Sequence, residues 1–255
     1  MRRFLFATFW VISATCGQVS VAQNVVAENV QVQSANRMNV YFLSGLGADK
    51  RVFSQLHLDS TFNVHYIGWI KPLRKETLPH YASRLIAQID TTQPFQLVGL
   101  SFGGIIASEI SNIVKPEQII LISSTSTGVP LSKGYQALVK FALFSPFAAP
   151  ILKSANSIAY KKFGADTPEL KKLLKAILKD TNSNFLKWAL TRLSSWGRPA
   201  KAANIFHIHG ANDQLIKINL VNPDVVIPNA GHLMIYAQAD EISGILNRQL
   251  GSAVR

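Results

Sequence analysis

The chain has 255 residues, of which 48% are hydrophobic and 16% are charged. That length can enclose a sizeable hydrophobic core, and the apolar share excludes a disordered or low-complexity protein. The 26 Lys and Arg against 14 Asp and Glu give a net charge of +12, which favours nucleic acid, an anionic membrane surface or acidic substrates as partners. The distribution of these charges along the chain therefore decides between the partners.

The first 22 residues have the pattern of a secretory signal peptide. Arg2 and Arg3 precede an apolar run over 4–14, and small residues before Ala22 suit a cleavage site. The run is shorter than the roughly 20 residues that span a bilayer. We therefore predict a secreted or periplasmic protein, with anchoring by an uncleaved N-terminus as the alternative. Lipidation of Cys16 is left open, and cleavage after Ala22 removes this only cysteine and with it any disulfide or cysteine nucleophile.

A polar stretch over 23–38, predicted to be a linker, precedes a region in which short apolar runs alternate with amphipathic ones. This alternation predicts an α/β fold with a mostly parallel, doubly wound sheet of about six strands. The core is predicted to comprise 39–130 and 201–255. The predicted strands are Asn39–Leu43, Val64–Gly68, Phe95–Val98, Gln118–Ile122, Ile205–His209 and Val225–Ile227. The predicted helices are Ala48–Leu56, Leu78–Ile89, Phe102–Val114 and Leu233–Leu250.

Residues 131–200 interrupt the alternation, and we predict a helical insert between the fourth and fifth strands. A helix start is visible at Thr167, Pro168 and Glu169, which supply a capping side chain, a proline at the first helical position and an acid in the first turn. Apolar side chains at helical spacing follow, opposite a row of lysines, and a second apolar stripe predicts another helix.

The same insert holds most of the net charge, with 12 Lys and Arg against three acids. A solvated helix face that aids solubility is the simpler interpretation. Contact with an anionic membrane surface, or steering of anionic substrates, is the alternative. Export and the lack of interleaved aromatic and basic residues argue against nucleic acid as a partner.

The most informative motif is Gly-Leu-Ser-Phe-Gly-Gly over 99–104, between a predicted buried strand and a predicted helix. A sharp strand-to-helix turn needs small flanking residues, and it presents its central side chain at the carboxyl edge of the sheet. Ser101 is therefore a candidate nucleophile. The alternative is a serine that only caps the helix.

A serine hydroxyl needs a base to take its proton and a third group to orient that base. Two later strands are each followed by a turn with a suitable side chain, Asp213 and His232. The loop after the first strand carries two glycines, which allow its backbone to approach the nucleophile closely. We predict the backbone N–H groups of Leu46 and Phe102 as donors to an oxyanion.

Over 39–250 the sequence resembles the α/β-hydrolase superfamily, in which nucleophile, acid and histidine follow in this order. The resemblance implies that Ser101 is the nucleophile, His232 the general base and then acid, and Asp213 its orienting carboxylate. It also implies that 131–200 form a helical cap over the site.

Several other polar residues carry no predicted chemistry. His207 and His209 share one face of a strand, as metal ligands can, but no third ligand has suitable spacing. We predict no metal and no cofactor. The remaining candidates are interpreted as surface, packing or helix-capping residues: Asp49, His57, His65 and His80.

The predicted function is that of a secreted serine hydrolase, similar to carboxylesterases or thioesterases. It would cleave small-molecule esters of small to medium apolar acyl groups through an acyl-enzyme. The alternatives are a non-catalytic binding protein of the same fold and a lipase or amidase that associates with membrane surfaces. Acyl and leaving-group specificity, including amides and lactones, stay open.

Overall fold

The computed structural model describes residues 37–128, 134, 150, 152–194, 196–197 and 204–252. The predicted signal peptide over 1–22, most of the predicted linker and parts of the predicted insert lie outside these residues. Across the described part of the chain, no helix has both the length and the apolar character needed to cross a membrane.

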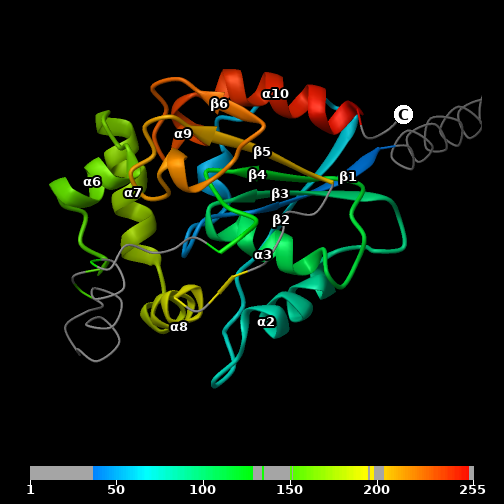
Figure 1. Cartoon of the computed structure of the whole chain (residues 1–255), viewed down its shortest axis with the longest axis horizontal. Coiled ribbons are helices and arrows are strands. Elements are labelled where there is room, and N and C mark those ends of the chain that lie inside the picture. Colours follow the sequence, from blue (N-terminus) through cyan, green and yellow to red (C-terminus); the bar gives the residue numbers. More distant parts are fainter. Residues whose placement is uncertain are drawn as a thin grey trace, which may run out of the picture. The chain divides into compact units, whose positions relative to one another are not determined.

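A six-stranded sheet forms the centre of the described region, in the order β2-β1-β3-β4-β5-β6 (Figure 1). All neighbouring strands pair in parallel, which confirms the predicted parallel sheet and its six strands. The bounds agree with the prediction to within two residues. The strands are β1 (Met38–Leu43), β2 (Phe62–Ile67), β3 (Phe95–Leu100), β4 (Ile119–Ile122), β5 (Ile205–Gly210) and β6 (Val225–Ile227).

Successive strand residues pack against opposite layers, because side chains alternate across a pleated strand. In β1, Val40 and Phe42 join the apolar cluster under α10 (Ala239–Ser252), while Tyr41 and Leu43 join the cluster on the other face. That second cluster is covered by α2 (Leu78–Leu85) and α3 (Phe102–Ile110). Strands β3 and β4 are buried throughout, so their apolar residues pack against the helices on both faces of the sheet (Figure 1).

The four predicted core helices differ in detail from the structure, and α3 ends at Ile110 rather than at Val114. The helix predicted over 48–56 is a single 3-10 turn, η1 (Lys50–Phe53), and the Ser54 N–H closes it on the Arg51 carbonyl three residues back. The helix predicted over 233–250 is divided into α9 (Met234–Ala237) and α10, because the backbone of Gln238 leaves the helical region. Helix α2 continues as a 3-10 turn, η2 (Ile86–Gln88). A further 3-10 turn, η3 (Ile218–Leu220), precedes β6.

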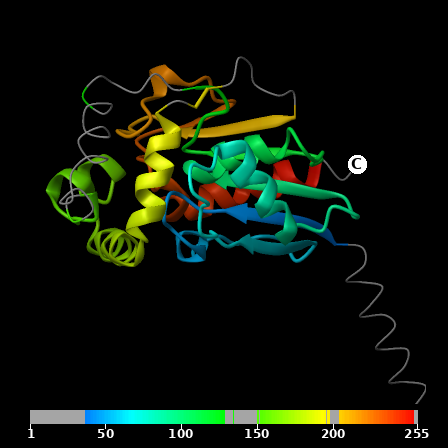
Figure 2. The same cartoon turned by 90° about the horizontal axis from the view of Figure 1, so that it is seen from below.

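Three helices occupy the described part of the predicted insert, between β4 and β5. These are α6 (Ser157–Phe163), α7 (Pro168–Asp180) and α8 (Ser183–Leu193). Helix α7 begins as predicted, with the Thr167 side chain accepting a hydrogen bond from the Leu170 N–H. The three helices lie beyond the carboxyl ends of the strands (Figures 1 and 2).

The insert is tied to the core by polar contacts at both α7 and α8. Arg51, beside β1, pairs with Asp180 at the end of α7 at 2.8 Å. The indole Nε1–H of Trp188 in α8 donates to the Glu76 carbonyl at 2.8 Å, and Trp188 also packs on Tyr81 of α2. These contacts hold the insert against the loops that follow β1 and β2.

A buried carboxylate fixes the loop between β2 and α2. The Glu76 side chain is fully buried and accepts hydrogen bonds from the Leu73 N–H at 2.6 Å and from Arg84 at 2.9 Å. His80, predicted to be an ordinary surface or packing residue, also reaches Glu76, with 2.6 Å between Nδ1 and Oε1. Burial opposes ionisation of this carboxyl, but its donors outweigh that effect and hold the pKa of Glu76 below its usual value.

Replacing Glu76 by Gln is therefore expected to lower the free energy of unfolding by about 1–3 kcal/mol at neutral pH, because the charged hydrogen bonds are lost. A lowered pKa stabilises the fold above the unfolded-state pKa of about 4.3, and this contribution disappears as the pH falls through the folded-state value. The difference between wild type and Glu76→Gln should shrink from about pH 7 to about pH 3 in urea denaturation. Glu117→Gln, at an exposed acid, is the control, and a pH-independent difference for Glu76→Gln would contradict the assignment.

Candidate active site

The strand order reverses between β1 and β3, the two neighbouring strands from which the chain proceeds in opposite directions. In open parallel sheets such a reversal opens a crevice at the carboxyl ends of the strands, where ligands bind. Ser101 directly follows β3, and the loop 44–49 follows β1, so both predicted parts of the site lie at this crevice.

Ser101 has a backbone conformation that residues other than glycine rarely adopt, with φ of 53° and ψ of −118°. Such a conformation is strained and persists only when its surroundings hold it. The Ser101 N–H donates to the Ile122 carbonyl at 2.9 Å, and the Ser124 hydroxyl donates to the Ser101 carbonyl at 2.6 Å. The Ser101 side chain makes no capping hydrogen bond to α3, which removes the interpretation of Ser101 as a simple helix cap.

The glycines of the motif allow the turn to close. A Cβ on Gly103 would overlap the carbonyl oxygens of Leu43 and Ser44, and one on Gly104 would overlap the Ser124 hydroxyl. Helix α3 can therefore approach the ends of β1 and β4 only with glycine at these two positions. The close approach explains the Gly-Gly pair that follows Ser101.

The three predicted side chains meet at the carboxyl edge of the sheet. His232 Nε2 lies 2.9 Å from Ser101 Oγ, and His232 Nδ1 lies 2.7 Å from Asp213 Oδ2. His232 and Asp213 are almost completely buried. Phe163 of α6 places its ring edge-to-face with the His232 imidazole, at 5.8 Å between centroids. The insert thus contacts the histidine directly.

Asp213 is held as a carboxylate. Burial opposes its ionisation, but the His232 ring and the Ile216 N–H outweigh burial and keep the pKa of Asp213 below its usual value. Its Oδ1 accepts hydrogen bonds from the Leu215 and Ile216 N–H groups at 2.8 and 2.9 Å. An ionised Asp213 accepts the Nδ1–H of His232, which leaves Nε2 as the ring nitrogen that faces Ser101 Oγ.

Two further histidines lie behind Asp213. His209 Nε2–H donates to the Ile216 carbonyl at 2.7 Å and lies 3.5 Å from Asp213 Oδ2. Its Nδ1 lies 3.1 Å from Nε2 of His207. Burial lowers the pKa of His209, so its ring is neutral at physiological pH and supports the Asp213 turn through its N–H. The two histidines of β5 thus contact each other and, through His209, the turn that carries Asp213.

The two predicted oxyanion donors belong to Phe102, the residue after Ser101, and to Leu46, in the loop after β1. Phe102 begins α3, whose first N–H groups have no partner within the helix. Gly45, which precedes Leu46, lies close to the nucleophile: a Cβ on Gly45 would lie 3.7 Å from Ser101 Cβ. The Ser44 hydroxyl donates to the Ala48 carbonyl at 2.7 Å, which closes the loop that carries Leu46.

An aromatic cluster adjoins this loop and was not predicted as a unit. Trp69, in the loop after β2, packs on Phe102 of α3 and Phe185 of α8, with ring centroids 5.4 and 5.6 Å apart. The Trp69 indole Nε1–H donates to the Gly45 carbonyl at 3.2 Å. The sequence signal for this cluster was Trp69 itself, an aromatic residue directly after a predicted strand and therefore at the carboxyl edge of the sheet.

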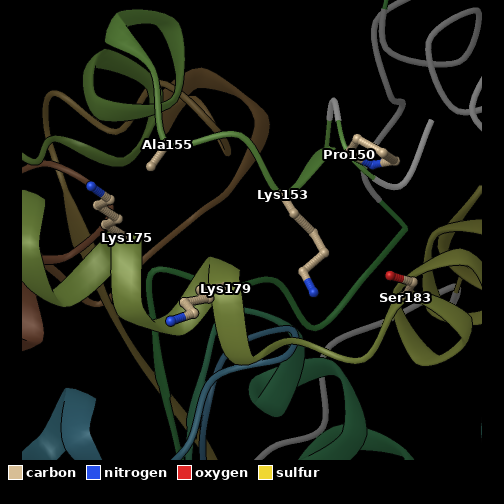
Figure 3. A pocket seen from close by; sticks show the side chains of 6 residues that line it. All are labelled: Pro150, Lys153, Ala155, Lys175, Lys179 and Ser183. Atoms are coloured by element: carbon tan, nitrogen blue, oxygen red, sulfur yellow. The ribbon is translucent and has the colours of Figure 1, made fainter. Parts of the chain in front are cut away.

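A cavity of about 480 Å³ lies within the insert (Figure 3). Ser101, Asp213 and His232 do not line it. Lys175 and Lys179 project from α7, and Lys153 enters from the segment before α6 (Figure 3). The cavity is lined by Pro150, Lys153, Ala155, Lys175, Lys179 and Ser183.

The tight approach of α3 predicts opposite effects for two helical glycines. Alanine is favoured over glycine in helices by up to about 1 kcal/mol. At Gly103 this gain is outweighed by overlap with the end of β1, so Gly103→Ala should lower the free energy of unfolding by about 2 kcal/mol or more. Gly244→Ala in α10 is the control, because its Cβ would meet only the Arg248 side chain at 3.6 Å. Equal stability of the two variants in thermal or urea denaturation would contradict the close approach.

Comparisons with known proteins agree with the observed fold. The model of a family described as the alpha/beta hydrolase family matches residues 40–244. A comparison with curated proteins finds no matching sequence.

Solved structures share the fold at low sequence identity. An esterase from Thermogutta terrifontis is 16% identical, with 86% of this chain and 91% of that chain covered and a TM-score of 0.63. A hydrolase from Oleispira antarctica is 17% identical, with 83% and 90% covered and a TM-score of 0.65. A bromoperoxidase from Bacillus anthracis is 14% identical, with 84% and 92% covered and a TM-score of 0.67. The different names of these proteins show that the shared fold does not by itself define the reaction.

Proposed function

The chain belongs to the alpha/beta hydrolase family, and on that premise we propose that it is a serine hydrolase that cleaves esters of small to medium apolar acyl groups. The observation that carries the proposal is the continuous hydrogen-bonded series from Ser101 through His232 to Asp213, with distances of 2.9 and 2.7 Å. Folding alone gives no reason to place a strained serine beside a buried histidine and a buried carboxylate.

The proposed reaction forms an acyl-enzyme. Ser101 Oγ attacks the ester carbonyl carbon while His232 Nε2 takes the hydroxyl proton. The negative charge on the carbonyl oxygen is bound by the N–H groups of Leu46 and Phe102, and Asp213 stabilises the imidazolium. His232 then protonates the leaving alcohol. In the second half, His232 removes a proton from water, which attacks the acyl-enzyme. His232 then returns that proton to Ser101 Oγ as the bond to the acyl group breaks and the acid is released.

Apolar contacts near the site support the proposed acyl group. Leu46, next to Gly45 in the loop near Ser101, packs against Leu186 and Leu190 of α8, as Leu152 also does. Phe163 covers the other side, against His232. These side chains favour hydrocarbon over a charged acyl group. We assign the insert the role of a cap on the same basis, since α6 and α8 both contribute to these contacts.

Two substitutions and a set of esters test the nucleophile. Fluorophosphonate probes should label the wild type, and p-nitrophenyl esters should be hydrolysed fastest with short to medium acyl chains. Ser101→Ala should lose labelling and about 10⁴-fold or more of the turnover, with an unchanged melting temperature. Ser111→Ala, at the end of α3 where the hydroxyl donates to the Ser108 carbonyl, is the control and should keep both.

Labelling that persists in Ser101→Ala would show that the nucleophile is another residue. A wild type with neither labelling nor ester turnover would favour the alternative of a non-catalytic binding protein. Turnover restricted to long-chain lipid esters or to amides would favour the lipase or amidase alternative.

We further propose that the protein is exported and that its insert binds anionic membrane surfaces. The pattern over 1–22 supports export, and the exposed lysines of α7, among them Lys171 and Lys172, support electrostatic contact with anionic lipid. Expression of the full chain in a bacterial host should yield a periplasmic or secreted protein that begins at Gln23. Part of it should pellet with washed membranes at low salt and be released by about 0.5 M salt, because screening weakens such contacts. An uncleaved chain, or membrane binding that salt does not change, would contradict this part of the proposal.

A further inference from the structure

The indole of Trp69 makes a hydrogen bond whose position is unusual for a packing residue. Its Nε1–H donates to the Gly45 carbonyl at 3.2 Å, and the Ala48 N–H donates to the same oxygen at 3.0 Å. A carbonyl oxygen accepts two such bonds, so both lone pairs of the Gly45 oxygen are used. The oxygen is therefore fixed from two directions.

The fixed oxygen also fixes the Leu46 N–H. The Gly45 carbonyl and the Leu46 N–H belong to one planar peptide group and point in opposite directions within that plane. Donors that hold the oxygen on one side thus direct the N–H to the other. Gly45 itself lies against Ser101, with its Cβ position 3.7 Å from Ser101 Cβ. Donors on the oxygen also polarise the peptide group, which strengthens its N–H as a donor.

We propose that Trp69 is a positioning residue that orients and polarises the Gly45–Leu46 peptide group as an oxyanion donor. This inference rests on the proposed function. Trp69 acts through the peptide and does not touch the reacting atoms.

The packing around Trp69 supports this role. Its ring contacts Phe102, the residue whose N–H is the second proposed donor, and Phe185 of the insert. Tyr81 of α2 packs on a further side, at 6.4 Å between ring centroids. Three elements therefore restrict the indole so that its N–H stays directed at the Gly45 oxygen.

Trp188 provides a matched comparison. Its indole Nε1–H also donates to a backbone carbonyl, that of Glu76, at 2.8 Å, and its ring packs on Tyr81 and Phe185 as the Trp69 ring does. Replacement of either tryptophan by phenylalanine removes one indole hydrogen bond from the same aromatic cluster. Only one of the two bonds reaches the peptide group beside Ser101.

The test measures kcat and KM for p-nitrophenyl butyrate, the inhibition constant of butylboronic acid and the melting temperature. Boronic acids form a tetrahedral adduct with a serine nucleophile, so their affinity reports the oxyanion donors. Trp69→Phe should lower kcat about tenfold, change KM less than about twofold, and raise the boronate inhibition constant by about the same factor as kcat falls. Trp188→Phe should leave kcat and the boronate constant within about twofold, whatever its effect on the melting temperature.

A second replacement removes the hydrogen bond without changing the shape of the ring. Benzothienylalanine at position 69 has sulfur in place of the N–H group and should reproduce the loss of kcat and of boronate affinity. Equal effects of Trp69→Phe and Trp188→Phe, or normal kcat with benzothienylalanine, would overturn the inference. A wild type without turnover or probe labelling would instead overturn the proposed function.

Discussion

The contact between the first turn of α3 and the end of β1 determines the geometry of the whole site. Gly103 lies so close to the carbonyl groups of Leu43 and Ser44 that a methyl group does not fit between them. This approach brings the strained Ser101 turn beside the loop that begins at Ser44, and so sets the nucleophile and the proposed oxyanion donors in one place. The cost of the strained backbone, on the order of 1–3 kcal/mol, is offset by the packing of buried strands on either side. His232 contacts the Ser101 hydroxyl, and Asp213 contacts His232 in turn.

The insert stabilises the same loop from its other end. Gly47 has a left-handed backbone with φ of 70°, and the Thr181 side chain fills the space that a Cβ at Gly47 would occupy. The Thr181 hydroxyl lies within hydrogen-bond distance of the Gly47 carbonyl, at 3.2 Å, while it also bonds the Ile177 carbonyl at 2.7 Å. Arg51 bridges Asp49 and Asp180 nearby. The loop after β1 is thus enclosed by α3 on one side and by the corner between α7 and α8 on the other, which couples the insert to the proposed oxyanion site.

Local patterns predicted the strands, the Ser101 turn and the helix start at Thr167, because each is encoded by neighbouring residues. The proximity of Ser101, Asp213 and His232 could also be predicted from the sequence, since parallel strands bring their carboxyl ends to one edge of the sheet. Other contacts between distant segments could not be predicted from the sequence. The Trp69 indole reaches Gly45 only because β1 and β2 are neighbours, and His209 supports Asp213 only through the turn after β5. The Glu76–His80 contact spans four residues and was detectable, but its importance depends on burial, which the sequence does not show.

Strands β4 and β5 are direct neighbours in the sheet although the whole insert separates them in sequence. Their pairing continues to the edge, where the Ser123 N–H donates to the Ile208 carbonyl at 3.1 Å. Because the two strands are parallel, the chain leaves the core at the carboxyl end of β4 and returns at the amino end of β5, on the opposite edge of the sheet. Loop closure between fixed ends becomes only slowly more unfavourable with length. An insert of different length can thus connect the same two strand ends without a change of register in the sheet, provided that it keeps the contacts of Thr181 and Asp180 with the loop after β1.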